Sequence, residues 1–548
     1  MEGDGNGSAL GDESPQNLQS DGEASFLSGN LFLDHVGEVT LTQNPDGLSW
    51  KLLESSENES RCLGFKLVPR VATEIKFSDV YAVEFSNCSL MHGSDLSIAG
   101  KCFLSHGSVA SEMFCFTVHG FQRSQSQPCL WVLAAYTFGH KDLQTCQMWV
   151  NQVNASLKMQ IGRPKSLLVL VNPMSGKANG CNIWEKVAPI FSRAKVKTKV
   201  IVTLRAGHAH DIMVTTTNKE LNSYDGVVAV VSGYGSSILC IFLINIISIA
   251  GYPSYSKFMI LETLNDDSKI TGLICSTTGA RDPITSALHI VLGKRVCLDV
   301  AQVVRWKTKS TSKVEPFVRY AASFAGYGFY GDVITESEKL RWMGPKRYDI
   351  AGTKVFLTHR SYEAEVAYLE VESEKPCAAP DNCCQQGRIW PLRSTNKSER
   401  VVCQVNCIIC NTKPIPHAKP YSRLEETRWK KSKGCFLSVA AALISNRNER
   451  APDGLVVDAH LSDGFLHLIL IKDCPRAMYL WHLTQLAKKG GTPLNFDFVE
   501  YHKTTAFTFT SFGKESVWNL DGELFEAHQL SAQVFQGLVW LFASGPEV

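Results

Sequence analysis

The chain has 548 residues and a formal net charge of +2, and its composition is 44% hydrophobic and 20% charged. This length allows roughly three or four domains, and the composition is that of a soluble globular protein. The near-neutral charge excludes a global attraction to nucleic acid, so we predict no nucleic-acid partner and expect any membrane contact to come from a local surface.

No segment predicts a signal peptide or a transmembrane helix. The first 24 residues hold six acidic side chains and neither Lys nor Arg, which favours a disordered tail over 1–24. The longest apolar run, 238–250, is 13 residues long, whereas a membrane-spanning helix needs about 20. We therefore expect a cytoplasmic protein whose 18 cysteines are reduced thiols.

Residues 25–160 predict a small antiparallel β-barrel closed by a helix. Short apolar segments alternate with turn signals, and in 142–157 apolar residues, one of them a Trp, recur at helical spacing. Strands closed by one helix with a buried Trp resemble a pleckstrin-homology domain. That resemblance implies a phosphoinositide pocket at Lys66, Arg70 and Lys76, and scattered surface charge is the alternative interpretation.

Residues 161–300 change to an alternation of strands and helices. Continuous apolar runs predict buried strands at 166–171, 196–204 and 227–231, and helical patterns follow the first two. An alternation of this kind predicts a parallel, doubly wound sheet, which would form an α/β lobe.

The loop after the first of these strands, 172–177, predicts an anion site. Backbone N–H groups at the start of a helix bind anions, Gly176 leaves them unobstructed, and Lys177 adds positive charge. The spacing of this loop differs from that of a P-loop.

Three motifs in this lobe resemble the diacylglycerol-kinase-type catalytic domain, which diacylglycerol, sphingosine and ceramide kinases share. They are NPxSGK after the first strand, T-x-x-x-GHA after the second, and an Asp-Gly pair before the third. The resemblance implies that Thr203 lies near the nucleoside of bound ATP. It also implies that the loop after the first strand binds the phosphates through Asn172, Pro173, Ser175, Gly176 and Lys177.

Residues 232–235 occupy the place of the family's GGDG motif, in which the Asp accepts the proton of the lipid hydroxyl. This chain reads SGYG there, so Tyr234 stands between Gly233 and Gly235 where the Asp belongs. A tyrosine whose pKa has its ordinary value of about 10 is a poor base near neutral pH. The predicted catalytic loop therefore lacks its expected base.

The segment 236–271 matches nothing that the resemblance leads us to expect, and the family's second nucleotide loop is absent from it. Familiar sequence resumes near Cys275. Our hypothesis is that this atypical segment reflects an altered splice or gene model rather than an evolved insertion.

Residues 301–548 predict an antiparallel β-sandwich lobe with a polar insertion at 372–400. A helix is predicted at 478–488. The strands of this lobe are predicted at 298–306, 317–324, 436–445, 454–459, 465–471, 506–512 and 516–520. The expected fold class is therefore α+β and multidomain.

A Gly- and aromatic-rich loop at 326–332 leads into a helix, and GYGFYGDV with SEKLRWMGPKRYD resembles ceramide kinases, those of plants included. The resemblance implies that Arg341 and Arg347 bind ATP phosphates, a task that suits the arginine fork. It also implies that Asp332 contacts the lipid headgroup. A solvated helix face is the alternative interpretation of the arginines.

The spacing Cys403-x-x-x-Cys407-x-x-Cys410 is a cysteine signature of ceramide kinases. Three thiols would bind zinc if a fourth ligand joined them, and His417 is the nearest candidate. Packed free thiols are an equally good interpretation.

The run Asp521-Gly522-Glu523 matches the family's late DGE motif. Two carboxylates on either side of a glycine suit Mg²⁺ that is held together with nucleotide phosphates. We therefore predict that Asp521 and Glu523 bind the metal, and an Asp-Gly hairpin turn is the alternative interpretation.

The resemblance implies transfer of the γ-phosphoryl group of ATP to the primary hydroxyl of ceramide at a membrane surface. It implies ATP and Mg²⁺ as cofactors, Ca²⁺ as a stimulating ion, and a protein that associates peripherally with membranes. Two alternatives stay open. One is a catalytically impaired lipid-binding or regulatory protein, or the product of an altered gene model, and the other is a sphingosine or diacylglycerol kinase.

Overall fold

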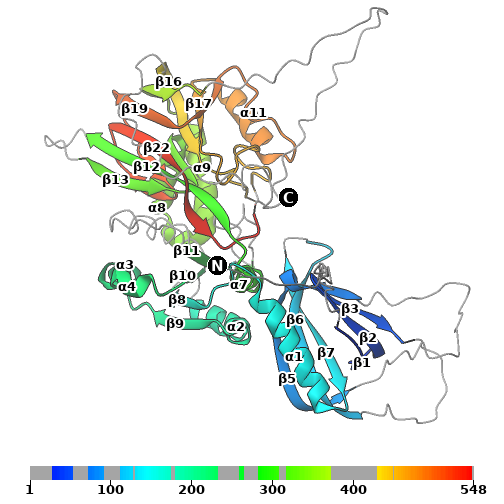
Figure 1. The fold of residues 1–548 in the computed structure, drawn as a ribbon. Helices are drawn as coiled ribbons and strands as arrows, with labels where there is room; N and C mark the ends of the chain where they lie inside the picture. Colours follow the sequence, from blue (N-terminus) through cyan, green and yellow to red (C-terminus); the bar gives the residue numbers. More distant parts are fainter. Residues whose placement is uncertain are drawn as a thin grey trace, which may run out of the picture. The chain divides into compact units, whose positions relative to one another are not determined.

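The computed structural model describes about two thirds of the chain (Figure 1). The described residues are 27–53, 72–91, 111–127, 130–173, 179–205, 207–232, 258–263, 282–307, 316–371, 429–448 and 450–545. The chain divides into two compact units, of which the first is Met1–Ser78, Phe85–Phe116 and Thr137–Trp149. The second is Asp79–Glu84, Thr117–Tyr136 and Val150–Val548. The predicted tail at 1–24 and the predicted insertion at 372–400 lie outside the described residues.

The N-terminal strands form a seven-stranded sheet in the order β4-β3-β2-β1-β7-β6-β5. They are β1 (Leu27–Leu33), β2 (Gly37–Asn44), β3 (Gly47–Leu52), β4 (Glu74–Lys76), β5 (Val80–Met91), β6 (Ser111–Arg123) and β7 (Trp131–His140), with a short 3₁₀ helix, η1 (Phe77–Asp79). The pairings of β1 with β2 and β7, and of β3 with β2 and β4, are antiparallel. The prediction of short antiparallel strands is confirmed for these pairs.

Helix α1 (Leu143–Lys158) follows the sheet, as predicted. The Asp142 carboxylate caps its start, because it accepts a hydrogen bond from the backbone N–H of Thr145 at 2.9 Å. The buried Trp expected on this helix is Trp149, whose ring stacks on Phe116 with the centroids 6.5 Å apart. Of the three predicted phosphoinositide ligands, Lys76 is exposed at the end of β4, and the other two lie outside the described residues.

The second sheet is parallel, with the strand order β11-β10-β8-β9. Its strands are β8 (Ser166–Val171), β9 (Lys197–Val202), β10 (Gly226–Ser232) and β11 (Phe258–Thr263). The prediction of a parallel sheet is confirmed. The strand β11 belongs to the atypical segment 236–271, and its backbone pairs in register with β10 from Val227 opposite Phe258.

Helices cover both faces of this sheet, which confirms the doubly wound prediction. Alternate residues of β8 face opposite sides, so Leu167 and Val169 pack with α2 (Gly180–Arg193) and α7 (Pro283–Val291). On the other side Leu168 and Leu170 pack with α3 (His208–Thr215). A four-residue helix, α4 (Asn218–Leu221), follows α3.

The third sheet has eleven strands and contains most of the C-terminal half of the chain. Its strands are β12 (Val296–Lys307), β13 (Phe317–Ala321), β14 (Phe324–Gly328), β15 (Tyr362–Leu369), β16 (Trp429–Ala442), β17 (Leu466–Lys472), β18 (Val499–Thr504), β19 (Ala506–Phe512), β20 (Trp518–Leu520), β21 (Glu523–Phe525) and β22 (Gln529–Leu541). Nine strands follow the order β13-β12-β22-β19-β15-β16-β14-β20-β21, and β17 pairs with β16 and β18.

This sheet is antiparallel as predicted, but it is one continuous sheet rather than two stacked ones. The strands at the two ends of the order come together, because the rings of Phe317 in β13 and Phe525 in β21 lie 6.0 Å apart. One core cluster draws residues from β12 through β22. The sheet therefore curls around that core, a closure that strand-by-strand patterns do not reveal.

Four helical segments accompany this sheet: α8 (Phe329–Glu338), the 3₁₀ helix η2 (Arg341–Lys346), α9 (Arg347–Thr358) and α11 (Arg476–Ala487). The helix predicted at 478–488 is therefore confirmed as α11. Among the helices of the described residues, none is long and apolar enough to cross a membrane.

Several sequence predictions for this half were wrong. The strand predicted at 454–459 is a series of turns, because Gly454 has a left-handed φ of +82° and leaves no room for a side chain against Ser445. The loop predicted at 326–332 is the end of β14 and the start of α8. The strands β15, β18 and β22 were not predicted at all.

Candidate active site

The carboxyl ends of β8, β9 and β10 meet at one edge of the parallel sheet. Val171 in β8 pairs with Val202 in β9 and with Val230 in β10, so the residues that follow these strands lie at the same edge. This edge is where open α/β sheets bind ligands. The predicted nucleotide loop, Thr203 and the SGYG sequence all follow these three strand ends.

The residues that flank 174–178, Asn172 after β8 and Gly180 at the start of α2, lie close together. The backbone N–H of Asn172 donates to the Val230 carbonyl at 3.0 Å. A side chain at Gly180 would lie 2.1 Å from the Asn172 carbonyl oxygen, so only glycine permits this approach. Asn179 at the start of α2 makes no side-chain hydrogen bond to the helix backbone. Of the predicted phosphate ligands, Asn172 and Pro173 are at this edge, and Ser175, Gly176 and Lys177 lie outside the described residues.

Thr203 fixes the end of β9 to β8. Its backbone N–H and its hydroxyl both donate to the Val171 carbonyl, at 2.8 and 3.3 Å. The side chain is buried. Its predicted place near the nucleoside stays a prediction, and the hydroxyl already has a structural partner.

The description of β10 ends at Ser232, at the same edge. Gly233, Tyr234 and Gly235, the residues that replace the expected GGDG base, lie outside the described residues. The Cys403, Cys407 and Cys410 cluster also lies outside them. Among the described residues, no group of three or more His, Cys, Asp or Glu side chains could hold a metal ion.

The structure brings the two predicted phosphate-binding arginines together on one carboxylate. The Glu338 side chain at the end of α8 places Oε2 2.5 Å from Nε of Arg341 and Oε1 3.1 Å from Nη1 of Arg347. Arg347 also donates to the hydroxyl of Tyr348 at 2.7 Å. Arg341 is 72% exposed and Arg347 only 12%, so Arg347 is the more firmly positioned of the two.

Asp332, the predicted headgroup ligand, joins three parts of the fold. Its carboxylate accepts hydrogen bonds from the Tyr362 hydroxyl at 2.5 Å and from the Ser516 hydroxyl at 2.6 Å. Burial raises the pKa of Tyr362, and the hydrogen bond to Asp332 raises it further. Both oxygens of Asp332 therefore already have protein partners, and its contact with a lipid stays a prediction.

The DGE motif forms the two-residue turn that joins β20 to β21. Asp521 and Gly522 both have left-handed φ values, +50° and +97°, as an Asp-Gly hairpin turn requires. The hairpin interpretation of this motif is therefore correct for its backbone. Glu523, the next residue, is partly exposed and lies 3.9 Å from Arg319.

The Asp521 side chain turns inward and binds the connection between β13 and β14. Its carboxylate accepts hydrogen bonds from the backbone N–H groups of Ala322, Ser323 and Phe324 at 2.6, 3.0 and 2.7 Å, and from the Ser323 hydroxyl. Burial raises the pKa of Asp521, and these hydrogen bonds act in the opposite direction. A carboxylate engaged by four donors does not fit a metal ligand. The side chain of Glu523 reaches solvent, and its contact with a metal stays a prediction.

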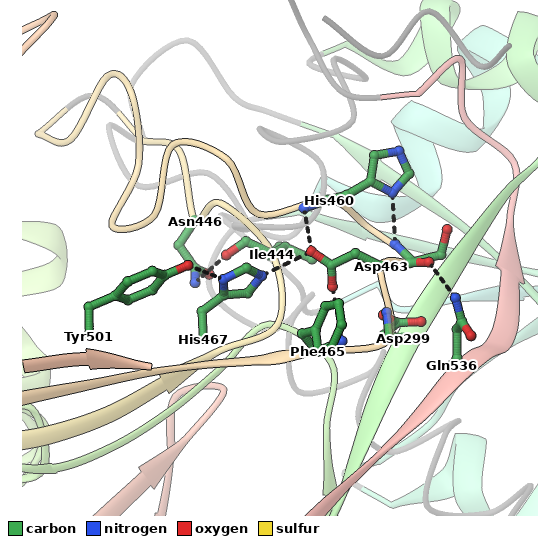
Figure 2. A network of polar contacts seen from close by, with 11 residues as sticks. Asp299, Ile444, Asn446, His460, Asp463, Phe465, His467, Tyr501 and Gln536 are labelled. Carbon is green, nitrogen blue, oxygen red and sulfur yellow. Dashed lines mark hydrogen bonds and ion pairs between the residues drawn. The ribbon is translucent and has the colours of Figure 1, made fainter. Parts of the chain in front are cut away.

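A buried polar network that the sequence did not suggest includes side chains of β17 and β18 (Figure 2). Nδ1 of His467 lies 2.7 Å from the Tyr501 hydroxyl, and Nε2 lies 3.0 Å from the Asp463 carboxylate. His467 is fully buried. The sequence around Asp463 predicted only a turn, because nothing local marks a histidine as the centre of a network.

Asp299 extends this network to β12 and β22. Its carboxylate accepts hydrogen bonds from the backbone N–H groups of Gly464 and Gly537, both at 2.6 Å. Burial raises the pKa of Asp299 to about 8, and the nearby Asp463 carboxylate contributes to the increase. The network thus ties the turn at Asp463 to two strands of the large sheet.

Comparisons with known proteins identify the family. The family model of the ceramide kinase C-terminal domain matches residues 323–517, and that of the diacylglycerol kinase catalytic domain matches 166–236. The ceramide kinase of Arabidopsis thaliana is 53% identical over 95% of this chain and 96% of its own length. That of Oryza sativa subsp. japonica is 44% identical over 94% and 99%. Sphingosine kinase 1 of Arabidopsis thaliana is 27% identical over 72% and 79%.

The same comparisons bear on the atypical segment. The catalytic-domain match ends at residue 236, where the familiar sequence stops. The alignment with the Arabidopsis thaliana ceramide kinase runs over 598 positions, more than the 548 residues of this chain, so it contains positions that this chain lacks. Identity above 50% across nearly the whole of both chains nevertheless leaves the relationship in no doubt. This chain belongs to the ceramide kinase family.

Proposed function

We propose that this chain transfers the γ-phosphoryl group of ATP to the primary hydroxyl of ceramide, giving ceramide 1-phosphate. The observation that carries the proposal is the match to ceramide kinases along nearly the whole chain. The meeting of three strand ends at one edge of the parallel sheet supports it, because ligands of such sheets bind there. Sphingosine is a less favoured substrate, since the sphingosine kinase relative matches less closely. Diacylglycerol is also less favoured, because the diacylglycerol kinase model matches only 166–236, whereas the ceramide kinase C-terminal model matches 323–517.

In this proposal, cationic and backbone groups position the triphosphate. Arg347 is the principal side chain, because Glu338 and Tyr348 hold its guanidinium in place. The helix start after the β8 loop adds backbone N–H donors, Lys177 adds charge, and Thr203 borders the nucleoside. Mg²⁺ bound with ATP supplies charge that offsets the charge of the transferring group, and Glu523 is the residue that would hold it.

The second candidate is a lipid-binding member of the family that has lost catalysis. Tyr234 stands where a base is needed, and the family match stops two residues later. Sequencing the transcript across 236–271 tests the hypothesis of an altered splice or gene model. Recovery of this same segment in the dominant message would contradict that hypothesis.

The decisive experiment is an assay of the full chain with ATP and a panel of ceramide, sphingosine and diacylglycerol in mixed micelles. We expect phosphorylation of ceramide above the other two lipids, and a loss of about 10²-fold or more in the Arg347→Ala variant. Arg450→Ala is the matched control, because Arg450 pairs with Asp349 and not with Glu338. Absence of any product from the unmodified chain would favour the lipid-binding candidate.

We also propose that the N-terminal strands with α1 form a pleckstrin-homology-type module that contacts membrane lipids, within the domain limits 25–160. Its supports are the seven-stranded sheet, the closing helix and the buried Trp149. Binding of the full chain to phosphoinositide-containing vesicles, compared with Lys66→Ala and Arg70→Ala variants, tests the module.

A further inference from the structure

Helix α11 (orange in Figure 1) carries large apolar residues on its exposed side as well as on the side that packs against the protein. Between Arg476 and Ala487 it carries no charged residue after the first position. A helix at the surface of a soluble domain normally shows a polar face opposite its buried one. On this helix the exposed positions include Met478, Leu480 and Trp481 beside the polar Thr484.

One side of α11 is packed against the large sheet. Tyr479 and His482 are buried, and Leu483 and Leu486 pack against the cluster formed by β16, β17 and β18. The Tyr479 ring also stacks on Phe356 of α9, with the centroids 6.2 Å apart. These contacts account for the inner side of the helix alone.

The outer side carries large apolar residues that reach solvent. Met478 is 44% exposed, Leu480 is 50% exposed and Trp481 is 58% exposed. Met478 and Trp481 are three residues apart and so lie on the same side of the helix. We call these three residues the α11 surface.

Positive charge lies at both ends of this helix, and only Lys488 and Lys489 at its C-terminal end complement the helix dipole. Arg476 is in the first turn, where a cation opposes the helix dipole, and Pro475 before it provides no side-chain cap. Lys488 and Lys489 follow the last turn. Within the described part of the chain, the side chains of Arg476, Lys488 and Lys489 form no ion pair. From 474 to 489 the sequence contains no acidic residue.

The exposed apolar residues of η2 and α9 have different surroundings, because the charged residues near them form ion pairs within the protein. In α9, Ile350 and Leu357 line a groove of about 590 Å³ together with Asp349, Thr353, Lys354 and Thr358. There Lys354 pairs with Glu336 at 2.6 Å, and Asp349 pairs with Arg450. The charges at that groove are thus neutralised within the protein, whereas those around α11 are left for another partner.

We propose that the α11 surface docks on an anionic membrane leaflet that contains the ceramide substrate, an inference that rests on the proposed function. Trp481 lies at the headgroup level, as amphipathic aromatic rings do. Met478 and Leu480 enter the acyl boundary, and Arg476, Lys488 and Lys489 contact anionic headgroups. Docking of this kind would keep the chain on the leaflet that holds its lipid substrate.

The test is sedimentation of the full chain with vesicles of phosphatidylcholine, phosphatidylserine and ceramide. We expect Trp481→Ala to lower the bound fraction about fivefold or more. Each of Lys488→Gln and Lys489→Gln should lower it about fivefold at low salt, and much less at high salt. The matched controls are Trp342→Ala and Leu357→Gln, which change exposed apolar residues outside α11 and should bind as the unmodified chain does.

A second measurement separates this inference from the proposed function. Ceramide phosphorylation in detergent mixed micelles should be unchanged in Trp481→Ala, since micelles deliver the lipid without a bilayer. Vesicle binding needs no catalysis, so an inactive chain would contradict the proposed function and leave the binding result valid. Failure of the unmodified chain to bind vesicles would overturn the docking proposal. So would loss of binding in Trp342→Ala but not in Trp481→Ala.

Discussion

Glu338 holds Arg347 by an ion pair of 3.1 Å, and the other oxygen of the same carboxylate lies 2.5 Å from Arg341. Two residues expected to bind phosphate are thus kept together by a negative group between them. The carboxylate fixes the separation of the two guanidinium groups before a nucleotide arrives. Pre-organisation of this kind lowers the cost of ordering long side chains on binding.

Glu338→Gln should raise the KM for ATP about three- to tenfold with a smaller change in kcat, because a neutral amide cannot hold two guanidinium groups. Steady-state kinetics with ATP as the varied substrate measure both KM and kcat. Glu336→Gln is the matched control, since Glu336 is on the same helix and pairs with Lys339 and Lys354 instead. A lower KM in Glu338→Gln would mean that the carboxylate competes with phosphate.

Asp521→Asn and Glu523→Gln should have different effects although the residues are two apart. Asp521→Asn should lower the free energy of unfolding by about 2–4 kcal/mol, because it disturbs a buried acceptor of four hydrogen bonds. Glu523→Gln should leave stability nearly unchanged and raise the Mg²⁺ concentration that gives half-maximal activity. Denaturant unfolding and Mg²⁺ titration measure the two effects. Equal destabilisation by both substitutions would contradict the division of roles.

Tyr234→Phe should leave the rate of ceramide phosphorylation unchanged within about twofold, because a tyrosine with its ordinary pKa contributes little as a base. Tyr234→Asp should raise the rate about 10²-fold or more, the usual contribution of a positioned general base. Initial rates in mixed micelles measure both. Loss of activity in Tyr234→Phe would show that the tyrosine hydroxyl takes part in the reaction.

Asp299 should make stability depend on pH. Its pKa is about 8 in the folded protein, above the ordinary value of a free carboxyl. The stabilisation linked to this proton is therefore complete below about pH 4 and lost as the pH rises through about 8. We expect the free energy of unfolding to fall between about pH 4 and pH 8, and Asp299→Asn to flatten that fall. An unchanged pH profile in Asp299→Asn would assign the dependence to another group.

His467 and Tyr501 should be energetically coupled. Each of His467→Gln and Tyr501→Phe should lower the free energy of unfolding by about 1–2 kcal/mol, because each leaves a buried partner unsatisfied. The double variant should lose less than the sum of the two, with a coupling of about 1 kcal/mol. Denaturant unfolding of the four proteins measures this cycle. Strict additivity would show that the hydrogen bond contributes no coupling.

Much of the parallel lobe followed from local pattern. Continuous apolar runs at 166–171 and 227–231 predicted two strands almost to the residue, because a strand buried on both faces needs apolar residues at every position. The large sheet was harder. The strand β15 was not predicted because its apolar residues are interrupted by charged ones. The apolar run at 454–459 was predicted as a strand but forms turns, because Gly454 has a left-handed φ.

The sequence alone determined the family, the alternation of strands and helices in the parallel lobe, and the residues expected to bind ATP. These depend on motifs and periodicities within short stretches. Only the tertiary structure decided what those residues contact. The Asp521 carboxylate binds a connection 198 residues away, Glu338 joins two arginines, and the ends of an eleven-stranded sheet meet at Phe317 and Phe525. Hydrogen bonds and ring contacts between distant segments depend on how the chain closes, and no local periodicity records that closure.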